Sequence, residues 1–420
     1  MPKVDHDISS GPVTRCQICG STNLELVIDL GHQPLSDSLP SEAQLQQPET
    51  TYPLRQMWCR DCTLSQLDYV VPGDVVYHPE YPYRSGITKE LATYQDALAG
   101  EAIDRLSLEA DSLVVDVGSN DGTLLAGFKR RGMRVMGVEP TNIAKIAREN
   151  GIDTLQAFFD EEAADQVIET SGHAKLITAT NVFAHMATLG SFMRGVQRLL
   201  APDGVFMIEN HYLLEIMRGG QFDTIYHEHL RSYSLKSLMV LFEQYGFTVI
   251  EARQVARYGG NIRVYASKDK NARASDSVDA ILKLENEFGL SESRAYEAFS
   301  ALAEKAKLNL LELALNCKKD GLRFVGNSCP ARASTLLNYA GIGKDLMPYM
   351  AEQPTSLKLH RHLPVKHIPI VDNSILIEEQ PDYVVLLAWH YWEPISEQLR
   401  ARGLKSKMVV PLPELRVLEP

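Results

Sequence analysis

The sequence lacks any long apolar run. Among its 420 residues no stretch of about 18 consecutive apolar residues occurs, so no membrane-spanning helix is predicted. The N-terminal segment MPKVDHDISSGPVTR has no apolar core of the secretory type, so we expect a cytoplasmic location. Internal repeats and long low-complexity segments are also absent.

The chain has fewer basic than acidic residues. The chain holds 42 Lys and Arg residues against 54 Asp and Glu residues, which gives a formal charge of −12. Nonspecific nucleic-acid binding needs clustered cations that displace counterions, so this balance disfavours it, although a local basic patch could exist. With 45% hydrophobic and 23% charged residues, the composition is that of an ordinary globular protein, and the length predicts two or three domains.

Cysteine is scarce, but four of the six cysteines form two C-x-x-C pairs. Paired knuckles of this kind in a chain without a secretion signal predict a tetrahedral zinc site. Such a closed site has no open coordination position, so its role should be structural. Two disulfides or a redox dithiol are the alternatives, and the 39 residues between the pairs must loop out. The predicted ligands are Cys16, Cys19, Cys59 and Cys62. Cys317 and Cys329 lie far away along the chain and are expected to be ordinary thiols.

The hydrophobic pattern divides the chain into three modules. Residues 12–72 form a small cysteine-bearing module with short strands such as LELVIDLG and YPLRQMWC. Residues 73–268 alternate apolar strands with helical periodicity, which predicts a doubly wound, mostly parallel sheet. Residues 269–420 begin with long helical patterns and then resume the alternation as a second, smaller α/β unit. The expected fold class is therefore α/β.

The stretch VVDVGSNDGTLL, residues 114–125, joins an apolar strand to a helix through a glycine loop. Gly118 lets the backbone pass close to a ligand, and Gly122 lets the helix begin near the strand end. Glu139 ends the next strand, about 20 residues further on, where an acidic residue can accept hydrogen bonds from two ribose hydroxyls. The loop is not G-x-G-x-x-G, so the pyrophosphate of a dinucleotide has no evident cradle. A glycine turn in an unrelated α/β domain is the alternative.

Together with NVFAHM at the fourth strand, this pattern resembles the class I S-adenosylmethionine-dependent methyltransferases. The resemblance predicts a Rossmann-like central domain that binds S-adenosylmethionine. Asn181 and Phe183 should line the donor pocket, with core packing as the alternative, and Phe158 and Phe159 could flank the adenine or pack in the core. The predicted cofactor-binding residues in this domain are Asp116, Gly118, Asn120, Asp121, Gly122, Glu139, Asn181 and Phe183.

The order of motifs along almost the whole chain is more specific. The two C-x-x-C pairs, DLGHQPLSDS, YPYRSG, the glycine loop, YHEH, GGNIR and a C-terminal α/β pattern follow one another. This order resembles the NDP-sugar C-methyltransferases of branched deoxysugar biosynthesis. The resemblance implies an N-terminal zinc-binding domain, a central methyltransferase domain, and a C-terminal α/β domain, with the sugar nucleotide between the last two.

The same resemblance assigns roles to residues. It maps the family's base to His229 and the neighbouring carboxylate to Glu228, a histidine after the fourth strand to His185, and the linker tyrosines to Tyr81 and Tyr83. This chain departs from the family at GNSCPARAS, where a glycine-rich turn is common, and at Tyr258, which precedes GGNIR in place of an expected histidine. These departures concern the identity of the sugar more than the class of reaction.

The chemistry of TIYHEHL, residues 224–230, follows from the reaction. A carbon next to a ketone becomes a nucleophile once a base removes its proton, and histidine has an ordinary pKa of roughly 6.5 that suits this role. We expect His229 to be the base and Glu228 to orient it or to replace it. Tyr226, His227 and His185 are weaker candidates that could position the substrate or stabilise an enolate. Packed structural histidines are one alternative; a metal held by His227 and His229 in an extended segment is another, without an evident third ligand.

Three further residues are predicted to bind the substrate. Asn261 and Arg263 in GGNIR could hold the diphosphate or sugar, since arginine matches phosphate geometry, and an ordinary strand edge is the alternative. Asn327 begins the divergent C-terminal turn that should contact the nucleotide or sugar.

The predicted function is transfer of a methyl group from S-adenosylmethionine to the carbon next to the keto group of an NDP-4-keto-deoxysugar, at C-3. Transfer to a sugar hydroxyl or amine is the alternative reaction. Two other classes remain: a partner-binding protein with an inactive methyltransferase-like domain, and a nucleic-acid methyltransferase, which the negative charge disfavours.

Overall fold

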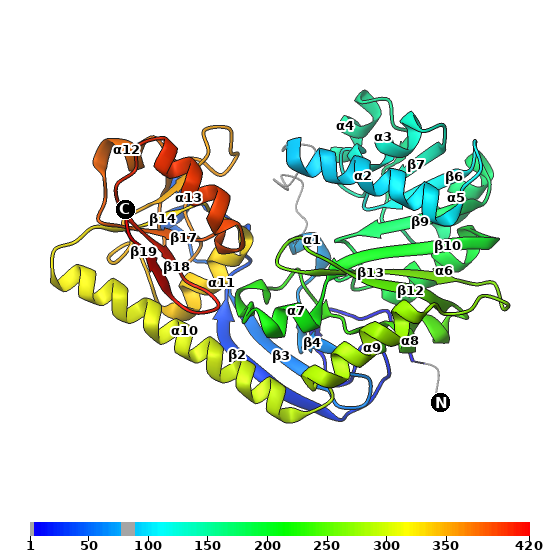
Figure 1. Cartoon of the computed structure of the whole chain (residues 1–420), viewed down its shortest axis with the longest axis horizontal. Coiled ribbons are helices and arrows are strands. Elements are labelled where there is room, and N and C mark those ends of the chain that lie inside the picture. The colour runs from blue at the N-terminus through cyan, green and yellow to red at the C-terminus, as the bar shows by residue number, and fades with distance from the viewer. Residues whose placement is uncertain (1–3, 77–88) are drawn as a thin grey trace.

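The computed structural model describes residues 4–76 and 89–420. The described chain folds around three main sheets, and the predicted α/β class is confirmed (Figure 1). Tyr81 and Tyr83 lie outside the described residues.

The N-terminal module is a four-stranded antiparallel sheet in the order β11-β4-β3-β2. The strands are β2 Leu24–Gln33, β3 Tyr52–Cys59, β4 Ser65–Leu67 and β11 Arg231–Ser232. A separate pair joins β1 Gly11–Pro12 to β5 Tyr69–Val70. Strand β11 comes from the middle of the chain, directly after the TIYHEHL segment, and it pairs with β4 through Arg231 opposite Gln66 and Ser232 opposite Ser65.

The central unit is a seven-stranded sheet in the order β12-β13-β10-β9-β6-β7-β8. Its parallel part confirms the predicted doubly wound arrangement, and β13 and β12 extend it antiparallel. The strands are β6 Leu113–Val117, β7 Arg134–Val138, β8 Thr154–Leu155, β9 Ala174–Thr180, β10 Leu200–His211, β12 Thr248–Val255 and β13 Asn261–Ser267. Strand β6 is buried along its whole length, as an inner parallel strand covered on both faces must be.

Helices cover this sheet and link it to the other modules (Figure 1). They are α1 Gly73–Val76, α2 Lys89–Leu106, α3 Thr123–Arg130, α4 Ile143–Glu149, α5 Glu161–Ser171, α6 Leu189–Leu199, α7 Leu213–Arg218, α8 Leu235–Gln244 and α9 Asp276–Phe288. Helix α8 begins at a capping box, in which the Ser234 hydroxyl accepts from the Ser237 amide.

The C-terminal unit has a six-stranded sheet in the order β16-β15-β14-β17-β18-β19, parallel except for β19. Its strands are β14 Phe324–Asn327, β15 Met350–Glu352, β16 Ile370–Asp372, β17 Tyr383–Leu386, β18 Lys407–Val410 and β19 Arg416–Leu418. Its helices are α11 Ala331–Ala340, α12 Ile375–Glu379 and α13 Trp392–Ala401.

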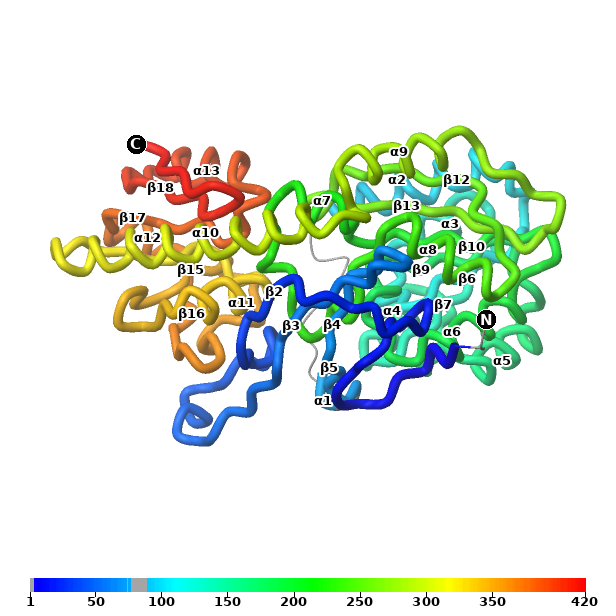
Figure 2. Tube along the Cα trace, turned by 90° about the horizontal axis from the view of Figure 1, so that it is seen from below, coloured from blue at the N-terminus to red at the C-terminus, as the bar shows by residue number. Residues whose placement is uncertain are grey.

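The long helix α10 Ser293–Lys319 ties the units together. It runs along one side of the molecule, past the N-terminal strands and on to the C-terminal unit (Figures 1 and 2). Tyr296 near its start stacks on the fully buried Trp58 of β3, with ring centroids 4.3 Å apart. The N-terminal strands lie between the two α/β units in both views, so one continuous core joins all three modules.

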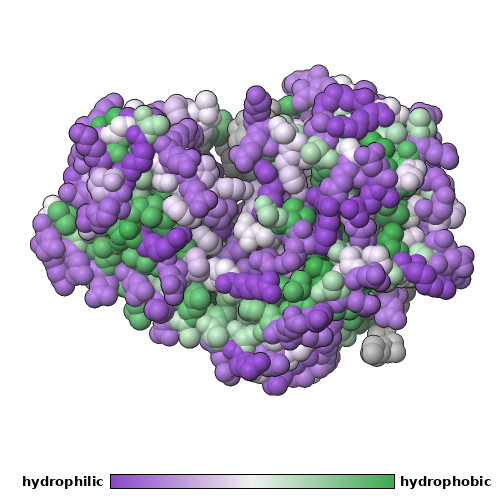
Figure 3. All heavy atoms as spheres, in the orientation of Figure 1, coloured by the Kyte–Doolittle hydropathy of each residue, from purple (hydrophilic) through white to green (hydrophobic). Residues whose placement is uncertain are grey.

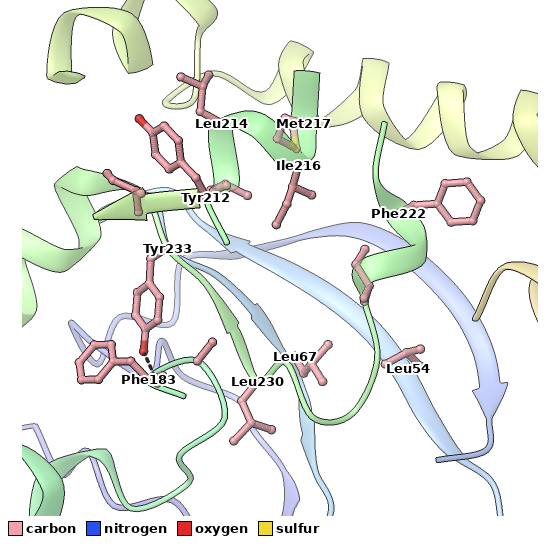
Figure 4. Close-up of a cluster of buried hydrophobic side chains, with 14 of the residues drawn as sticks. Leu54, Leu67, Phe183, Tyr212, Leu214, Ile216, Met217, Phe222, Leu230 and Tyr233 are labelled. Atoms are coloured by element: carbon pink, nitrogen blue, oxygen red, sulfur yellow. Dashed lines mark hydrogen bonds between the residues drawn. The ribbon is translucent and has the colours of Figure 1, made fainter. Parts of the chain in front are cut away.

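Part of that core surrounds the TIYHEHL segment. Leu67 of the N-terminal sheet lies near Leu230, and the Tyr233 hydroxyl donates to the Phe183 carbonyl oxygen at 3.2 Å (Figure 4). None of the helices in the described part of the chain combines the length and apolar character that crossing a bilayer requires.

Candidate active site

The residues from Ile225 to Leu230 form a turn, which we call the site turn. It is not an extended segment, because the His229 amide donates to the Tyr226 carbonyl oxygen at 2.9 Å. Side chains two apart therefore do not point the same way, and the geometry that would make His227 and His229 joint metal ligands does not form.

All three modules hold the site turn. The Leu67 amide of the N-terminal sheet donates to the Leu230 carbonyl oxygen at 3.0 Å. The Thr335 hydroxyl of α11 donates to the Ile225 carbonyl oxygen at the other end, also at 3.0 Å. The turn itself follows directly from the central unit, so its backbone position depends on contacts from three parts of the chain.

His229 lies in a cluster of rings. Its centroid is 4.0 Å from Tyr226, 4.3 Å from His211 and 5.0 Å from His185. His185 follows β9 and His211 is the last residue of β10, so both occupy the carboxyl edge of the sheet, where α/β folds bind ligands. The structure thus brings together three of the predicted residues and one histidine that the motifs did not indicate.

The surroundings keep this cluster neutral. Burial, followed by the neighbouring His211 and His185, lowers the pKa of His229 well below 6.5. Burial also lowers the pKa of His185 to about 3 and that of His211 to about 4. For Tyr226, burial and then the charge of Glu228 raise the pKa well above 10, so the phenol keeps its proton. Although packed protein surrounds them, His229, His185 and Tyr226 each retain some accessible surface.

A backbone contact fixes the tautomer of His229. Its Nδ1 lies 2.7 Å from the Thr224 carbonyl oxygen, which can only accept, so Nδ1 carries the hydrogen of the neutral ring. The lone pair is therefore on Nε2, and this is the atom that can act as a base.

His227 points elsewhere. Its Nε2 lies 3.2 Å from the Pro53 carbonyl oxygen on β3, and its ring packs edge-on against Tyr52. The ring is 2% exposed, and burial lowers its pKa to about 4. The expected catalytic contribution of His227 has no support in this arrangement, because the turn directs its ring toward the N-terminal sheet. Glu228 is buried within the site turn, and its charge acts on Tyr226.

The glycine loop adopts left-handed backbone conformations at Gly118 and Asn120. Gly118 has φ +71°, and a Cβ there would lie 2.4 Å from Val182 Cγ2, so only glycine fits. Asn120 is also left-handed, with φ +50°, and its amide donates to Glu139 Oε2 at 3.0 Å. The buried Ser119 hydroxyl has no hydrogen-bond partner among the described residues, which leaves an open polar group at the loop.

Glu139 directly follows β7, and most acceptor positions of its carboxylate are already occupied. Oε1 accepts from the Thr141 amide at 2.9 Å and from the Thr141 hydroxyl at 2.7 Å, while Oε2 accepts from Asn120. Of about four acceptor positions, one remains on Oε2. A single ribose hydroxyl therefore fits directly, and a second requires the Thr141 hydroxyl to turn away.

Two further predicted cofactor residues, one near the end of β6 and one in the loop, make hydrogen bonds inside the protein. Asp116 is buried and accepts from the Thr178 hydroxyl at 2.6 Å, and burial raises its pKa to about 7. Asp121 accepts from the Thr123 hydroxyl at 2.6 Å at the start of α3. Gly122 has φ +79°, and a Cβ there would lie 2.9 Å from Ile152.

The three phenylalanines predicted to lie near the donor pocket differ in burial. Phe183 is completely buried in a cluster with Phe192, Phe206, Tyr233 and Phe242, so core packing accounts for it. Phe159 is likewise buried and packs edge-on against Phe192. Phe158, by contrast, is 65% exposed just after β8 and is free to cover an adenine.

Asn181 and the GGNIR residues form a polar network inside the sheet. The Asn261 amide donates to Asn181 Oδ1 at 3.1 Å and to Glu209 at 3.3 Å. Arg263 is 2% exposed, and its guanidinium contacts Glu209 at 2.6 Å and Glu101 at 3.2 Å. This arginine pairs with one carboxylate of the neighbouring strand β10 and one of helix α2, which agrees with the strand alternative rather than with a phosphate ligand.

The C-terminal unit reaches the same region through Arg332, at the start of α11. Its Nη1 lies 3.2 Å from His390 Nδ1, and its Nε lies 3.8 Å from Asp223, which also accepts from the Trp389 indole at 2.7 Å. The positive charge of Arg332 adds to the lowering of the pKa of His229 and of His211, which burial dominates.

Asn327, the predicted substrate residue in this unit, is buried at the end of β14 and accepts from Ser328 at 3.4 Å. A hollow between the C-terminal and central units is visible in the space-filling view (Figure 3).

The four paired cysteines come together in the N-terminal module. Their sulfur atoms lie within 4.8 Å of one another, with Cys16–Cys62 and Cys19–Cys59 separations of 3.5 Å. A tetrahedral zinc ion with Zn–S bonds of about 2.3 Å would place sulfurs about 3.8 Å apart, so the arrangement fits zinc and excludes disulfides. No other metal-competent cluster occurs in residues 4–76 and 89–420.

Three family models cover the chain in succession. They describe a zinc binding domain over residues 16–77, a methyltransferase domain over residues 91–252, and a C-methyltransferase C-terminal domain over residues 256–413. The C-methyltransferase NovU of Streptomyces niveus is 33% identical over 412 residues, which cover 97% of each chain. The chain belongs to this C-methyltransferase family. It is therefore an S-adenosylmethionine-dependent C-methyltransferase with a zinc-binding N-terminal domain.

Solved structures align with part of this C-methyltransferase. A methyltransferase from Clostridium acetobutylicum is 12% identical, with a TM-score of 0.34, over 42% of this chain and 92% of its own. Another from Anabaena variabilis is 12% identical, with a TM-score of 0.34, over 42% of this chain and 85% of its own.

Proposed function

We propose that the enzyme methylates the carbon next to the keto group of an NDP-deoxysugar, at C-3 of a 4-keto sugar. The observation that carries this proposal is the state of His229. Its ring is neutral, its Nδ1 hydrogen is held by the Thr224 carbonyl, and its Nε2 lone pair is available beside a protonated tyrosine. A base and an oxyanion donor side by side are what enolate formation needs.

In the proposed reaction, His229 Nε2 takes the proton from the acceptor carbon. The electron pair of the C–H bond moves into the enolate, and the Tyr226 hydroxyl donates a hydrogen bond to the developing oxygen anion. Glu228 supplies negative charge within the same turn while His229 is cationic. When bound, S-adenosylmethionine supplies a methyl group on a positively charged sulfur, which leaves as a neutral thioether as the new C–C bond forms.

The methyl donor is proposed to lie at the glycine loop, with its ribose on Glu139. The positive φ of Gly118 and Asn120, the open Ser119 hydroxyl and the remaining acceptor position of Glu139 support this placement. Asn181, hydrogen-bonded to Asn261 at the end of β9, would face the donor. The sugar nucleotide is proposed to lie between the central and C-terminal units, where Arg332 brings a positive charge toward the cluster.

The test separates the two histidines of YHEH. Purified enzyme and an NDP-4-keto-deoxysugar are incubated in D₂O, and exchange of the proton next to the ketone is followed by NMR. His229→Ala should slow exchange and C-methylation by about 10²- to 10⁴-fold, the usual contribution of a general base. His227→Gln is the matched control and should keep both, because that ring faces β3.

Binding of S-adenosylmethionine, measured by calorimetry, should persist in both variants. Normal exchange in His229→Ala would refute its role as base. Methylation of a hydroxyl or amine without any exchange would instead establish the alternative reaction.

A further inference from the structure

His211 is a site residue that no motif indicated. It ends β10, in the stretch IENH, and it pairs across the sheet with Asn261 at the start of β13. Strand β10 runs parallel to β9, so His211 emerges at the same carboxyl edge as the glycine loop and the turn that bears His185. Its ring centroid lies 4.3 Å from that of His229.

The two nitrogens of His211 differ. The Arg231 backbone raises the pKa of the ring in part, against the larger effect of burial, while Nε2 is buried and has no hydrogen-bond partner within residues 4–76 and 89–420. Because Nε2 has no partner, we assign the hydrogen of the neutral ring to Nδ1. A lone pair remains on Nε2, in a side chain that is only 9% exposed. Buried polar atoms are almost always paired, so an open acceptor at the end of this strand calls for a donor from a ligand.

The nature of that donor follows from the chemistry of the ring. Because burial lowers the pKa of His211 to about 4, the ring is neutral near pH 7 and Nε2 can only accept. An enolate oxygen needs donors, so His211 cannot stabilise it. A hydroxyl group, which carries a hydrogen to donate, satisfies the open nitrogen.

We propose that His211 Nε2 accepts a hydrogen bond from a ring hydroxyl of the acceptor sugar, close to the carbon that His229 deprotonates. This assignment rests on the proposed ketosugar substrate. It makes His211 a specificity-determining residue, because an analogue without that hydroxyl would bury the nitrogen unpaired. Sites that pair a substrate hydroxyl reject the deoxy analogue strongly, and loss of one such bond is worth about 10- to 100-fold in kcat/KM.

The experiment compares substrates as well as variants. An NDP-4-keto-6-deoxyhexose and analogues that each lack one ring hydroxyl are given to the wild type, His211→Phe and His211→Gln. The wild type should prefer the parent over one analogue by about 10- to 100-fold in kcat/KM. His211→Phe, which keeps a ring beside His229, should lose that preference. His211→Gln should recover part of it, since its amide oxygen also accepts.

Melting curves and calorimetry with S-adenosylmethionine establish that each variant is folded. Two results would overturn the assignment: no hydroxyl preference in the wild type, or an equal loss on parent and analogues in His211→Phe. Such results with intact proton exchange contradict only the role of His211. A wild type that neither exchanges nor methylates any ketosugar contradicts the proposed function as well.

Discussion

Acidification should destabilise the fold through its buried histidines, and His227 allows this effect to be measured in isolation. Its ring is 2% exposed, and burial lowers its pKa from 6.5 to about 4. Below pH 6.5 the unfolded chain binds a proton at this residue and the native protein does not, so stability falls as the pH falls. The slope approaches about 1.4 kcal/mol per pH unit, which gives a loss of about 2 kcal/mol between pH 7 and pH 5.

The absolute curve contains other groups, so the prediction concerns a difference. His211 and His185 act in the same direction as His227, whereas Asp116 acts in the opposite direction because burial raises its pKa to about 7. The free energy of unfolding is measured by urea denaturation from pH 7 to pH 5. The gap between wild type and His227→Gln should change by about 2 kcal/mol over this range, in favour of the variant at low pH.

The control for this experiment is His173→Gln, which alters an exposed ring on the same protein. Its pH dependence should follow that of the wild type. Parallel curves for His227→Gln and wild type would show that the His227 ring reaches water in the native state, and the description of the site turn would then be wrong.

Two further predictions concern the cofactors. Glu139→Gln should weaken S-adenosylmethionine binding in calorimetry by about 10- to 150-fold, because hydrogen bonds to a charged group are worth about 1.5–3 kcal/mol. Glu169→Gln, on the exposed face of α5, should leave the affinity unchanged. Equal affinities of Glu139→Gln and wild type would remove Glu139 from the donor site. Cys59→Ser should lower the zinc content from about one ion per chain and should speed amide hydrogen exchange in β4 and β11. Cys317→Ser, which lies outside the four-cysteine site, should retain the metal. Full zinc content in Cys59→Ser would contradict the four-cysteine site.

Local pattern was sufficient to predict much of the architecture. The apolar strands before Gly118 and before Glu139 are β6 and β7, and the two C-x-x-C pairs meet as expected. These features depend on residues that are near in sequence or on the fixed chemistry of thiolate ligands. Short strands such as β15 and β19 escaped notice, because three residues carry too little periodicity.

Long-range contacts were beyond the reach of the sequence. Nothing in GGNIR shows that Arg263 pairs with Glu209 on the neighbouring strand β10, or that His211 lies beside His229. The direction of the His227 ring was also beyond the sequence. Only in an extended segment would His227 and His229 point the same way, but the bond from the His229 amide to the Tyr226 carbonyl oxygen closes a turn. A histidine at the carboxyl end of a strand next to the glycine-loop strands is a signal that could have pointed to His211.

The pairing of β11 with β4 gives the zinc module a part in the geometry of the site. Cys59 ends β3 and Cys62 shortly precedes β4, so a metal held by both closes the hairpin between these strands. β4 then pairs with the strand that follows the site turn, while the Pro53 carbonyl of β3 receives His227 from within it. A turn without helical or sheet hydrogen bonds of its own has little local rigidity. The position of His229 therefore depends on the sheet of the N-terminal module. In the proposed mechanism, the metal would therefore influence proton abstraction by fixing the backbone on both sides of His229, although it supplies no group to the reaction.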